Sequence, residues 1–154
     1  MKNVKFLLSA ALVFLASAAL AQDFSAPQYA KWGATPEERE QNILNSNFLK
    51  ESCDNRDYDA AAHYLKGLID KIPDAAESIY QRGAVVYKNK INRAKSVAEK
   101  NMFIDSLMLM YDMRAQYFGD NVKPGKTAFI LDQKAREFLR YKPNDRKGIR
   151  EAFR

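Results

Sequence analysis

The fold is decided by residues 57–73, which read Asp57-Tyr58-Asp59-Ala60-Ala61-Ala62-His63-Tyr64-Leu65-Lys66-Gly67-Leu68-Ile69-Asp70-Lys71-Ile72-Pro73. Apolar residues recur here every three to four positions, which predicts an amphipathic helix that ends at about Lys71. The alanines at positions 60–62 let a second helix backbone approach closely, and a proline cannot continue the helix. This stretch therefore predicts the second helix of an antiparallel helix hairpin.

The first helix of this hairpin is predicted immediately upstream. Thr35 is a capping residue, Pro36 suits the first helical position, and Glu38 completes a capping box. The helix is expected over residues 36–54, and residues 55–57 are expected to form the turn. Its apolar stripe is expected to contain Ile43, Leu44, Phe48 and Leu49, with Ser52 and Cys53 beyond.

Further helices are expected after Pro73, over residues 75–89, 96–118 and 126–141, and residues 146–154 look like the opening of a sixth helix. A glycine inside a helix costs about 1 kcal/mol relative to alanine, so Gly83 in the third helix predicts a close packing contact. The connection from residue 88 to residue 95 is expected to be long. The fifth helix is expected to pack through Ala128, Leu131, Ala135, Phe138 and Leu139.

The fourth predicted helix carries two apolar stripes. One contains Ile104, Leu107, Met108, Tyr111 and Phe118, and the other contains Phe103, Met110 and Tyr117. A helix that is apolar on more than one side is buried between layers rather than lying on a surface. Its methionines are therefore expected in the core (Met102, Met108, Met110 and Met113), and only Met113, which lies off both stripes, is available to a partner.

The segment before the first helix, residues 22–34, is expected to be an extended lead-in, because Pro27 and Gly33 interrupt it and no helical periodicity is present. Its aromatic side chains, Phe24, Tyr29 and Trp32, are expected to dock on the first helix hairpin rather than lie in water. A binding role for Trp32 is the alternative to docking.

The stretch from Tyr58 to Pro73 resembles the second helix of a tetratricopeptide (TPR) repeat, in which a small residue packs beneath the first helix and a proline closes the unit. Gly83 stands where the first helix of such a repeat has a small residue. Pro73 and Pro143 lie 70 residues apart, which is close to two repeats of about 34 residues. Residues 31–40 also resemble exported TPR proteins of Gram-negative bacteria. Ser52, where an aromatic residue is usual, and an insertion in the second repeat depart from the pattern.

The resemblance implies an all-α fold, namely a short right-handed α-solenoid of stacked antiparallel helix hairpins over residues 35–154, with about five helices and a partial sixth. A solenoid needs about three repeats and a polar terminal cap. The half-finished last hairpin therefore predicts a chain that is truncated at its C-terminus. If the chain is complete, the long fourth helix and the basic fifth helix must close the core themselves.

Residues 1–21 predict a signal peptide. Lys2 and Lys5 form a basic start, residues 6–20 form an apolar core, and small residues precede a cleavage site expected after Ala21. An uncleaved membrane anchor is the alternative, but the apolar core is shorter than the span of about 20 residues that crosses a bilayer. We therefore expect an exported protein, periplasmic or associated with the cell envelope, with one mature domain and no transmembrane span.

The charge of the chain is unevenly distributed. The formal net charge is +6, and it falls to about +4 when Lys2 and Lys5 leave with the signal peptide. Residues 121–154 carry ten Lys or Arg side chains against four Asp or Glu. A solvated helix face is the simplest interpretation, and attachment of residues 123–154 to an anionic surface is the alternative. Nucleic acid is not an expected partner of an exported protein.

The sequence offers no constellation for catalysis, and we expect no enzyme, no cofactor and no metal site. Cys53 is the only cysteine and His63 the only histidine, so an internal disulfide and a site built from several histidines are excluded. Gly125-Lys126-Thr127 follows a predicted helix, not a strand, and lacks the upstream glycine spacing of a phosphate-binding loop. Ligation of haem by His63 remains an alternative.

These observations predict a non-enzymatic scaffold of the cell envelope that binds an unidentified protein or peptide. The TPR resemblance implies that the first helix of each hairpin faces the concave side, so the candidate contacts are Asn45, Tyr80, Arg82 and Lys134. One alternative is a haem-handling or enzyme-associated protein whose catalytic part is absent from this chain. Another is attachment through the basic C-terminal segment.

Overall fold

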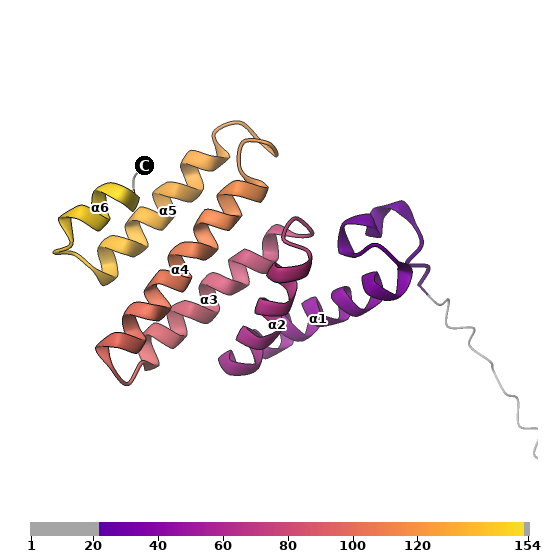
Figure 1. Cartoon of the computed structure of the whole chain (residues 1–154), viewed down its shortest axis with the longest axis horizontal. Coiled ribbons are helices and arrows are strands. Elements are labelled where there is room, and N and C mark those ends of the chain that lie inside the picture. Colours follow the sequence, from indigo (N-terminus) through magenta and orange to yellow (C-terminus); the bar gives the residue numbers. More distant parts are fainter. Residues whose placement is uncertain (1–21, 153–154) are drawn as a thin grey trace, which may run out of the picture.

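The computed structural model describes residues 22–152 of the 154-residue chain. The expected signal peptide, its cleavage site and the last two residues of the expected sixth helix lie outside this part. Helices are the only regular secondary structure in the described residues, which confirms the predicted all-α class (Figure 1). In chain order, these are η1 (Pro27–Trp32), α1 (Pro36–Asp54), α2 (Tyr58–Lys71), α3 (Glu77–Arg93), α4 (Val97–Phe118), α5 (Lys126–Tyr141) and α6 (Arg146–Ala152).

The helix starts follow the capping chemistry of the sequence. Thr35 Oγ1 accepts a hydrogen bond from Glu38 N at 3.2 Å, and Glu38 Oε2 accepts one from Ala34 N at 2.8 Å, as the predicted capping box requires. The same spacing begins α4, where Ser96 Oγ accepts from Glu99 N at 3.1 Å. Both helices therefore begin where a side chain satisfies the first free backbone N–H groups.

Helix α3 differs from its prediction at its C-terminal end. It continues to Arg93, so the expected long connection from residue 88 to residue 95 is wrong, and only residues 94–96 join α3 to α4. Ile91 explains the difference, because its side chain is buried in the core and holds one more turn of the helix. Lys90 and Arg93 in the last turn complement the negative end of the helix dipole.

The lead-in is not extended, which corrects the prediction for residues 22–34. Pro27 begins the short 3₁₀ helix η1, because its fixed φ suits a first helical position. The predicted docking of Trp32 is confirmed, since its side chain packs against the core. The Trp32 carbonyl oxygen also accepts a hydrogen bond of 2.7 Å from Nδ2 of the buried Asn42. The lead-in is thus anchored to α1 by both apolar and polar contacts.

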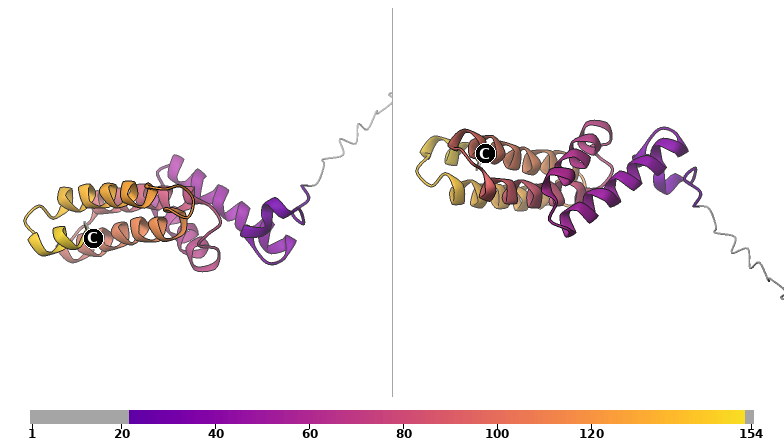
Figure 2. Two further views of the ribbon diagram at one scale, coloured as in Figure 1. Left: turned by 90° about the horizontal axis from the view of Figure 1, so that it is seen from above. Right: turned by 90° about the horizontal axis from the view of Figure 1, so that it is seen from below.

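Each helix packs on the next one in the chain, and α1 also contacts α3 (Figures 1 and 2). Two core clusters result. The first joins α1, α2, α3 and α4 and contains Leu49, Leu65, Leu68, Ile79, Tyr80 and Met110. The second joins α3, α4 and α5 and contains Ile91, Ile104, Leu107, Ile130, Ala135 and Phe138. Helix α4 belongs to both clusters, so its predicted burial on two sides is confirmed.

Several predicted core positions are wrong, because the exact rotation of each helix follows its packing partners. Met102 is 55% exposed, and Met113, predicted to be the one methionine open to a partner, packs against the first cluster. In α5 the buried stripe runs through Ile130, Ala135 and Phe138, which leaves two predicted stripe residues, Ala128 and Leu139, on the exposed side. Leu44 in α1 is likewise exposed.

Gly83 has the packing role that the sequence predicted. It is buried where α3 lies against both α2 and α4, and a Cβ at this position would come within 2.7 Å of Met110 Sδ and 3.1 Å of Leu65 Cδ2. Gly67, in the middle of α2, is exposed, and a Cβ there would have no atom within 4 Å. The two glycines therefore provide a matched pair for testing the packing of α3.

We expect opposite effects from alanine at these two positions. Gly83→Ala should lower the free energy of unfolding by up to about 2 kcal/mol, because the cost of about 1–3 kcal/mol for overpacking Met110 and Leu65 exceeds the gain of about 1 kcal/mol in helix propensity. Gly67→Ala should raise it by about 0.5–1 kcal/mol, because alanine is the better helix former and meets no neighbour. Urea unfolding followed by circular dichroism at 222 nm measures both, and a shift of the two variants in the same direction contradicts this packing.

Candidate functional site: a groove between α3 and α5

Helices α3 and α5 run parallel, because each is antiparallel to α4 (Figure 1). Helix α4 packs against both of them, whereas the backbones of α3 and α5 are not in direct contact within the described residues. A space between α3 and α5 is therefore left open above α4. Two sets of ion pairs cross it.

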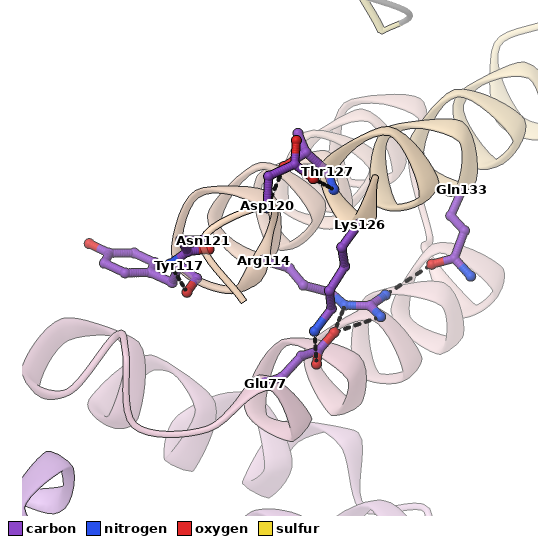
Figure 3. A network of polar contacts seen from close by, with 8 residues as sticks. All are labelled: Glu77, Arg114, Tyr117, Asp120, Asn121, Lys126, Thr127 and Gln133. Atoms are coloured by element: carbon purple, nitrogen blue, oxygen red, sulfur yellow. Dashed lines mark hydrogen bonds and ion pairs between the residues drawn. The ribbon is translucent and has the colours of Figure 1, made fainter. Parts of the chain in front are cut away.

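The first ion-pair bridge is centred on Glu77 at the start of α3 (Figure 3). Lys126 Nζ, from α5, lies 2.6 Å from Glu77 Oε2, and Arg114 Nε, from α4, donates to Glu77 Oε1 at 2.9 Å. Arg114 also donates a hydrogen bond of 2.9 Å to Oε1 of Gln133 on α5. All three charged side chains are at least three-quarters buried. One carboxylate thus ties three helices together.

The loop before α5 positions Lys126 for this bridge. Asp120 Oδ1 accepts from Thr127 N at 2.9 Å, and Thr127 Oγ1 accepts from Asp120 N at the same distance (Figure 3). This pair fixes the first turn of α5, where no N-cap side chain is available. The Gly125-Lys126-Thr127 sequence therefore serves the packing of α5.

The electrostatic state of Glu77 follows from these contacts. Burial is the largest single influence and raises the pKa of its carboxyl group, but the hydrogen bonds and charges of Lys126 and Arg114 together outweigh it. The net result is a pKa below the usual value for glutamate. The carboxylate form is therefore more stable in the folded chain than in the unfolded chain.

The second ion-pair bridge joins Lys88 of α3 to Glu137 of α5, with 2.5 Å between Lys88 Nζ and Glu137 Oε1. Positions 77 and 88 are eleven residues apart, as are positions 126 and 137. Eleven residues make about three helical turns, or about 16 Å, so each helix presents both of its charges on one face. Burial is the largest single influence and lowers the pKa of the Lys88 ammonium group. The hydrogen bond to Glu137 and the nearby Tyr111 together outweigh it, so the pKa lies above the usual value for lysine.

Between the two bridges lies a groove of about 370 Å³, here called the α3–α5 groove. Its floor includes Ala84, Met110 and Tyr111. Two large apolar side chains at its rim are open to solvent, namely Val85 of α3, which is 45% exposed, and Phe129 of α5, which is 57% exposed. Gln81 and Gln133 also line it. The groove therefore combines exposed apolar side chains with amide groups, and ion pairs between helices lie beyond each of its ends.

The structure does not gather the four predicted contact residues at one place. Tyr80 is among the residues that line the α3–α5 groove, but it is 1% exposed, and its hydroxyl group donates to the Pro73 carbonyl oxygen at 2.7 Å. Asn45 lines another groove, with His63, on α1 and α2. Lys134 pairs with Asp112 at 2.6 Å and lines a third groove, between α4, α5 and α6. Arg82 lies near Cys53.

Phe129 and Val85 were not among the predicted contact residues, but the sequence around Phe129 contains one feature that indicates an exposed apolar side chain. Residues 128–131 read Ala-Phe-Ile-Leu, and a helix stripe of about 100° cannot bury all of them on one side. At least one large apolar side chain had to face outward. The rotation of α5 against α4 decides that this side chain is Phe129. The rotation of α3 against α4 decides that Val85 lies on the same groove.

The described residues contain no group of three or more His, Cys, Asp or Glu side chains placed to hold a metal ion. His63 is exposed, with its ring 5.6 Å from the ring of Tyr64. Cys53 is half-buried; burial is the main influence and raises the pKa of its thiol, although Arg82 opposes it. Over residues 22–152, none of the helices combines the length and the apolar character needed to span a bilayer.

Much of the basic C-terminal charge is paired within the chain. Of the nine Lys and Arg side chains in residues 121–152, six lie within 4.0 Å of a carboxylate oxygen, namely Lys126, Lys134, Arg136, Arg140, Lys142 and Lys147. Such pairing leaves less free positive charge for an anionic surface than the sequence count indicates.

Comparison with known proteins assigns no relative. No family model, no curated protein and no solved structure matches this chain. The similarity of residues 57–73 to a TPR helix therefore stays an interpretation of those residues.

We expect the first bridge to make stability depend on pH. Because its folded pKa is lowered, Glu77 contributes stability above the pKa it has in the unfolded chain, and this contribution is lost as the pH falls through the lowered folded value. At pH 7, Glu77→Gln should lower the free energy of unfolding by about 1.5–3 kcal/mol. The difference from the wild type should shrink from about pH 5 downward.

The control for this measurement is Asp70→Asn, which removes an ion pair to Lys66 whose side chains are both more than half exposed. It should change the free energy of unfolding by less than about 1 kcal/mol at any pH. Urea unfolding at several pH values between 3 and 7 compares the two variants. A Glu77→Gln deficit that persists unchanged at pH 3 contradicts the assigned role of the carboxylate.

The second bridge can be tested by exchanging its charges. Lys88→Glu and Glu137→Lys should each destabilise the fold, because each leaves two like charges in a partly buried site. The double exchange should recover part of the loss, with a coupling energy of about 0.5–3 kcal/mol in a double-mutant cycle. Additive losses in the double variant, measured by urea unfolding, count against a direct contact across the groove.

Proposed function

We propose that this chain is an exported, non-enzymatic scaffold of the cell envelope that binds a protein or peptide partner in the α3–α5 groove. Export is supported by the signal-like composition of residues 1–21. A TPR-like array of helix hairpins, stacked as a right-handed solenoid, is supported by the TPR-like residues 57–73 and by the packing of each helix on the next.

The observation that carries this proposal is the exposure of Val85 and Phe129 on the same groove. Contiguous exposed apolar surface with a polar rim is typical of interaction sites, and aromatic side chains are frequent anchors in protein interfaces. The groove is also held at both ends by ion pairs between helices. A surface that is already ordered loses little conformational entropy on binding.

The position of the groove agrees with the TPR resemblance. If the hairpins are counted as α1–α2, α3–α4 and α5–α6, the groove lies between two first helices, which line the concave face in TPR arrays. Asn45 and Arg82 also lie on first helices and remain secondary contact candidates. Tyr80 also lines the groove, and beside it Val85 and Phe129 offer the more exposed apolar side chains.

Site-specific crosslinking tests the proposal. A photoreactive benzoylphenylalanine placed at position 129 of the full-length chain, expressed in its native host, should form an adduct with one or a few envelope proteins. The matched control places the same group at Val97, which is 77% exposed at the start of α4 and does not line the groove. Val85→Glu should abolish the adduct at position 129, because it puts an unpaired charge on the apolar rim.

Two outcomes oppose this proposal. Equal adducts at positions 129 and 97 show that crosslinking follows exposure alone. Adducts that survive Val85→Glu place the partner outside the α3–α5 groove.

A further inference from the structure

We infer that the partner in the α3–α5 groove is an acidic protein segment, which places one Asp or Glu carboxylate beside Arg114 and a nearby large apolar side chain against Val85 and Phe129. This inference rests on the proposed function and specifies the chemistry of its partner. Three observations lead to it, namely an excess of positive charge at the groove, the hydrogen-bond donors of Arg114, and the position of Phe129 one helical turn from these donors.

The first ion-pair bridge holds two cations on one carboxylate (Figure 3). Lys126 Nζ lies 2.6 Å from Glu77 Oε2, and Arg114 Nη2 lies 2.9 Å from Glu77 Oε1, so each carboxylate oxygen already has a cation. The side chains of Arg114 and Lys126 are both more than four-fifths buried, so neither charge is fully solvated. A partly buried cation in excess is costly, and a carboxylate from a partner offsets this cost.

The second ion-pair bridge has the same imbalance. Glu137 lies 2.5 Å from Lys88, and Arg140 lies 3.8 Å from its other carboxylate oxygen. Across the two bridges, four cations therefore meet two carboxylates. Such a surface attracts an acidic partner and repels a basic one.

The direction of the helices adds to the positive potential at the first bridge. Because α3 and α5 run parallel, both begin at this end of the groove, at Glu77 and Lys126 respectively (Figure 1). The start of a helix carries a partial positive charge of about half an elementary charge. Asp120 also lies near the start of α5, but its Oδ1 accepts a hydrogen bond from Thr127 N in the first turn.

Arg114 and Gln133 offer hydrogen-bond donors to the groove that both of them line. A guanidinium group has five N–H groups, and the contacts of Arg114 with Glu77 and Gln133 use three of them. Gln133 Oε1 accepts from Arg114 Nη1, so the amide NH₂ group is the part of Gln133 that is left for a ligand. Donors from both side chains suit an oxyanion, and the planar guanidinium matches the geometry of a carboxylate.

The apolar part of the groove lies next to these donors. Phe129 precedes Gln133 by four residues on α5, and side chains at this spacing are neighbours on one helix face, with about 5–6 Å between their Cβ atoms. An extended chain covers this distance in about two residues, at about 3.3 Å per residue. The acidic residue and the apolar residue of the partner are therefore expected about two positions apart.

The burial of the cations favours a protein side chain over a membrane surface. Lipid headgroups form a wide array that approaches exposed basic residues. Arg114 and Lys126 instead lie between helices, where a single carboxylate on a flexible side chain can enter. We therefore assign the carboxylate to a protein partner.

The inference can be tested with a phage-displayed library of random dodecapeptides, selected on the purified protein obtained by export of the full-length sequence. Enriched peptides should carry an Asp or Glu about two positions from a large apolar residue. The Kd of a synthetic enriched peptide should rise at least fivefold between 50 and 500 mM NaCl, because salt screens the new ion pair. Replacing its acidic residue by the matching amide should raise the Kd about tenfold.

Gln133→Glu is the decisive variant, because it supplies a carboxylate beside Arg114 from the chain itself. It should weaken peptide binding at least tenfold, and so should Phe129→Ala, which removes the apolar contact. The matched control Gln116→Glu makes the same change of charge at an exposed position of α4 outside the groove, and it should leave the Kd within twofold. Circular dichroism at 222 nm checks that each variant is folded.

The possible results separate this inference from the proposed function. Peptides that depend on Phe129 but share no acidic residue, or that bind Gln133→Glu as tightly as the wild type, overturn the ligand assignment and leave the proposed site standing. Peptides that are insensitive to Phe129→Ala, or no enrichment at all, overturn the inference, and the crosslink at position 129 then decides separately whether a protein uses this groove. Sedimentation with phosphatidylglycerol vesicles covers the lipid alternative, since vesicle binding that Gln133→Glu abolishes overturns the assignment to a protein.

Discussion

Burial of α4 on two sides is the constraint from which the rest of the architecture follows. Its side chains enter both core clusters, with Met110 and Phe118 in one and Ile104 and Leu107 in the other. Burial of each such side chain contributes about 1.5–3 kcal/mol to the free energy of folding, so α4 needs a neighbouring helix on each of its two apolar sides. Because α3 and α5 take these flanks, their backbones are held apart and a groove remains between them.

The ion pairs across this groove depend on the same arrangement. Two helices that are each antiparallel to α4 must be parallel to one another, and parallel helices keep their register over several turns. Charges spaced by about three turns on both helices can then meet twice, as Glu77 with Lys126 and Lys88 with Glu137 do. The two pairs have opposite polarity, which disfavours a shift of α5 by one turn. Packing places the helices, and the partly buried charges fix their register.

Local chemistry in the sequence was enough to predict most helix boundaries, whereas tertiary contacts set the rest. Thr35, Asp57 and Gly119 mark the ends of helices through caps and breaks that act within a few residues. The end of α3 carries no such signal, and its last turn depends on Ile91 reaching the core. Likewise, Tyr80 was chosen as a contact for its residue type, but the rotation of α3 puts it in the core and turns Val85 outward. The exposure of a side chain depends on how the helices pack together, and the apolar pattern of a single helix does not predict it.

On the proposed function, the α3–α5 groove would bind a partner mainly through its exposed apolar side chains, Val85 and Phe129. The first ion-pair bridge places two cations, Lys126 and Arg114, on the single carboxylate of Glu77, so this end of the groove carries a net positive charge. On the same proposal, further affinity would come from surfaces beside the groove, for which Arg82 of α3 and Asn45 of α1 are the candidates. Because each helix packs on the next, these positions would be held at fixed distances from the groove, and several modest contacts would then act together.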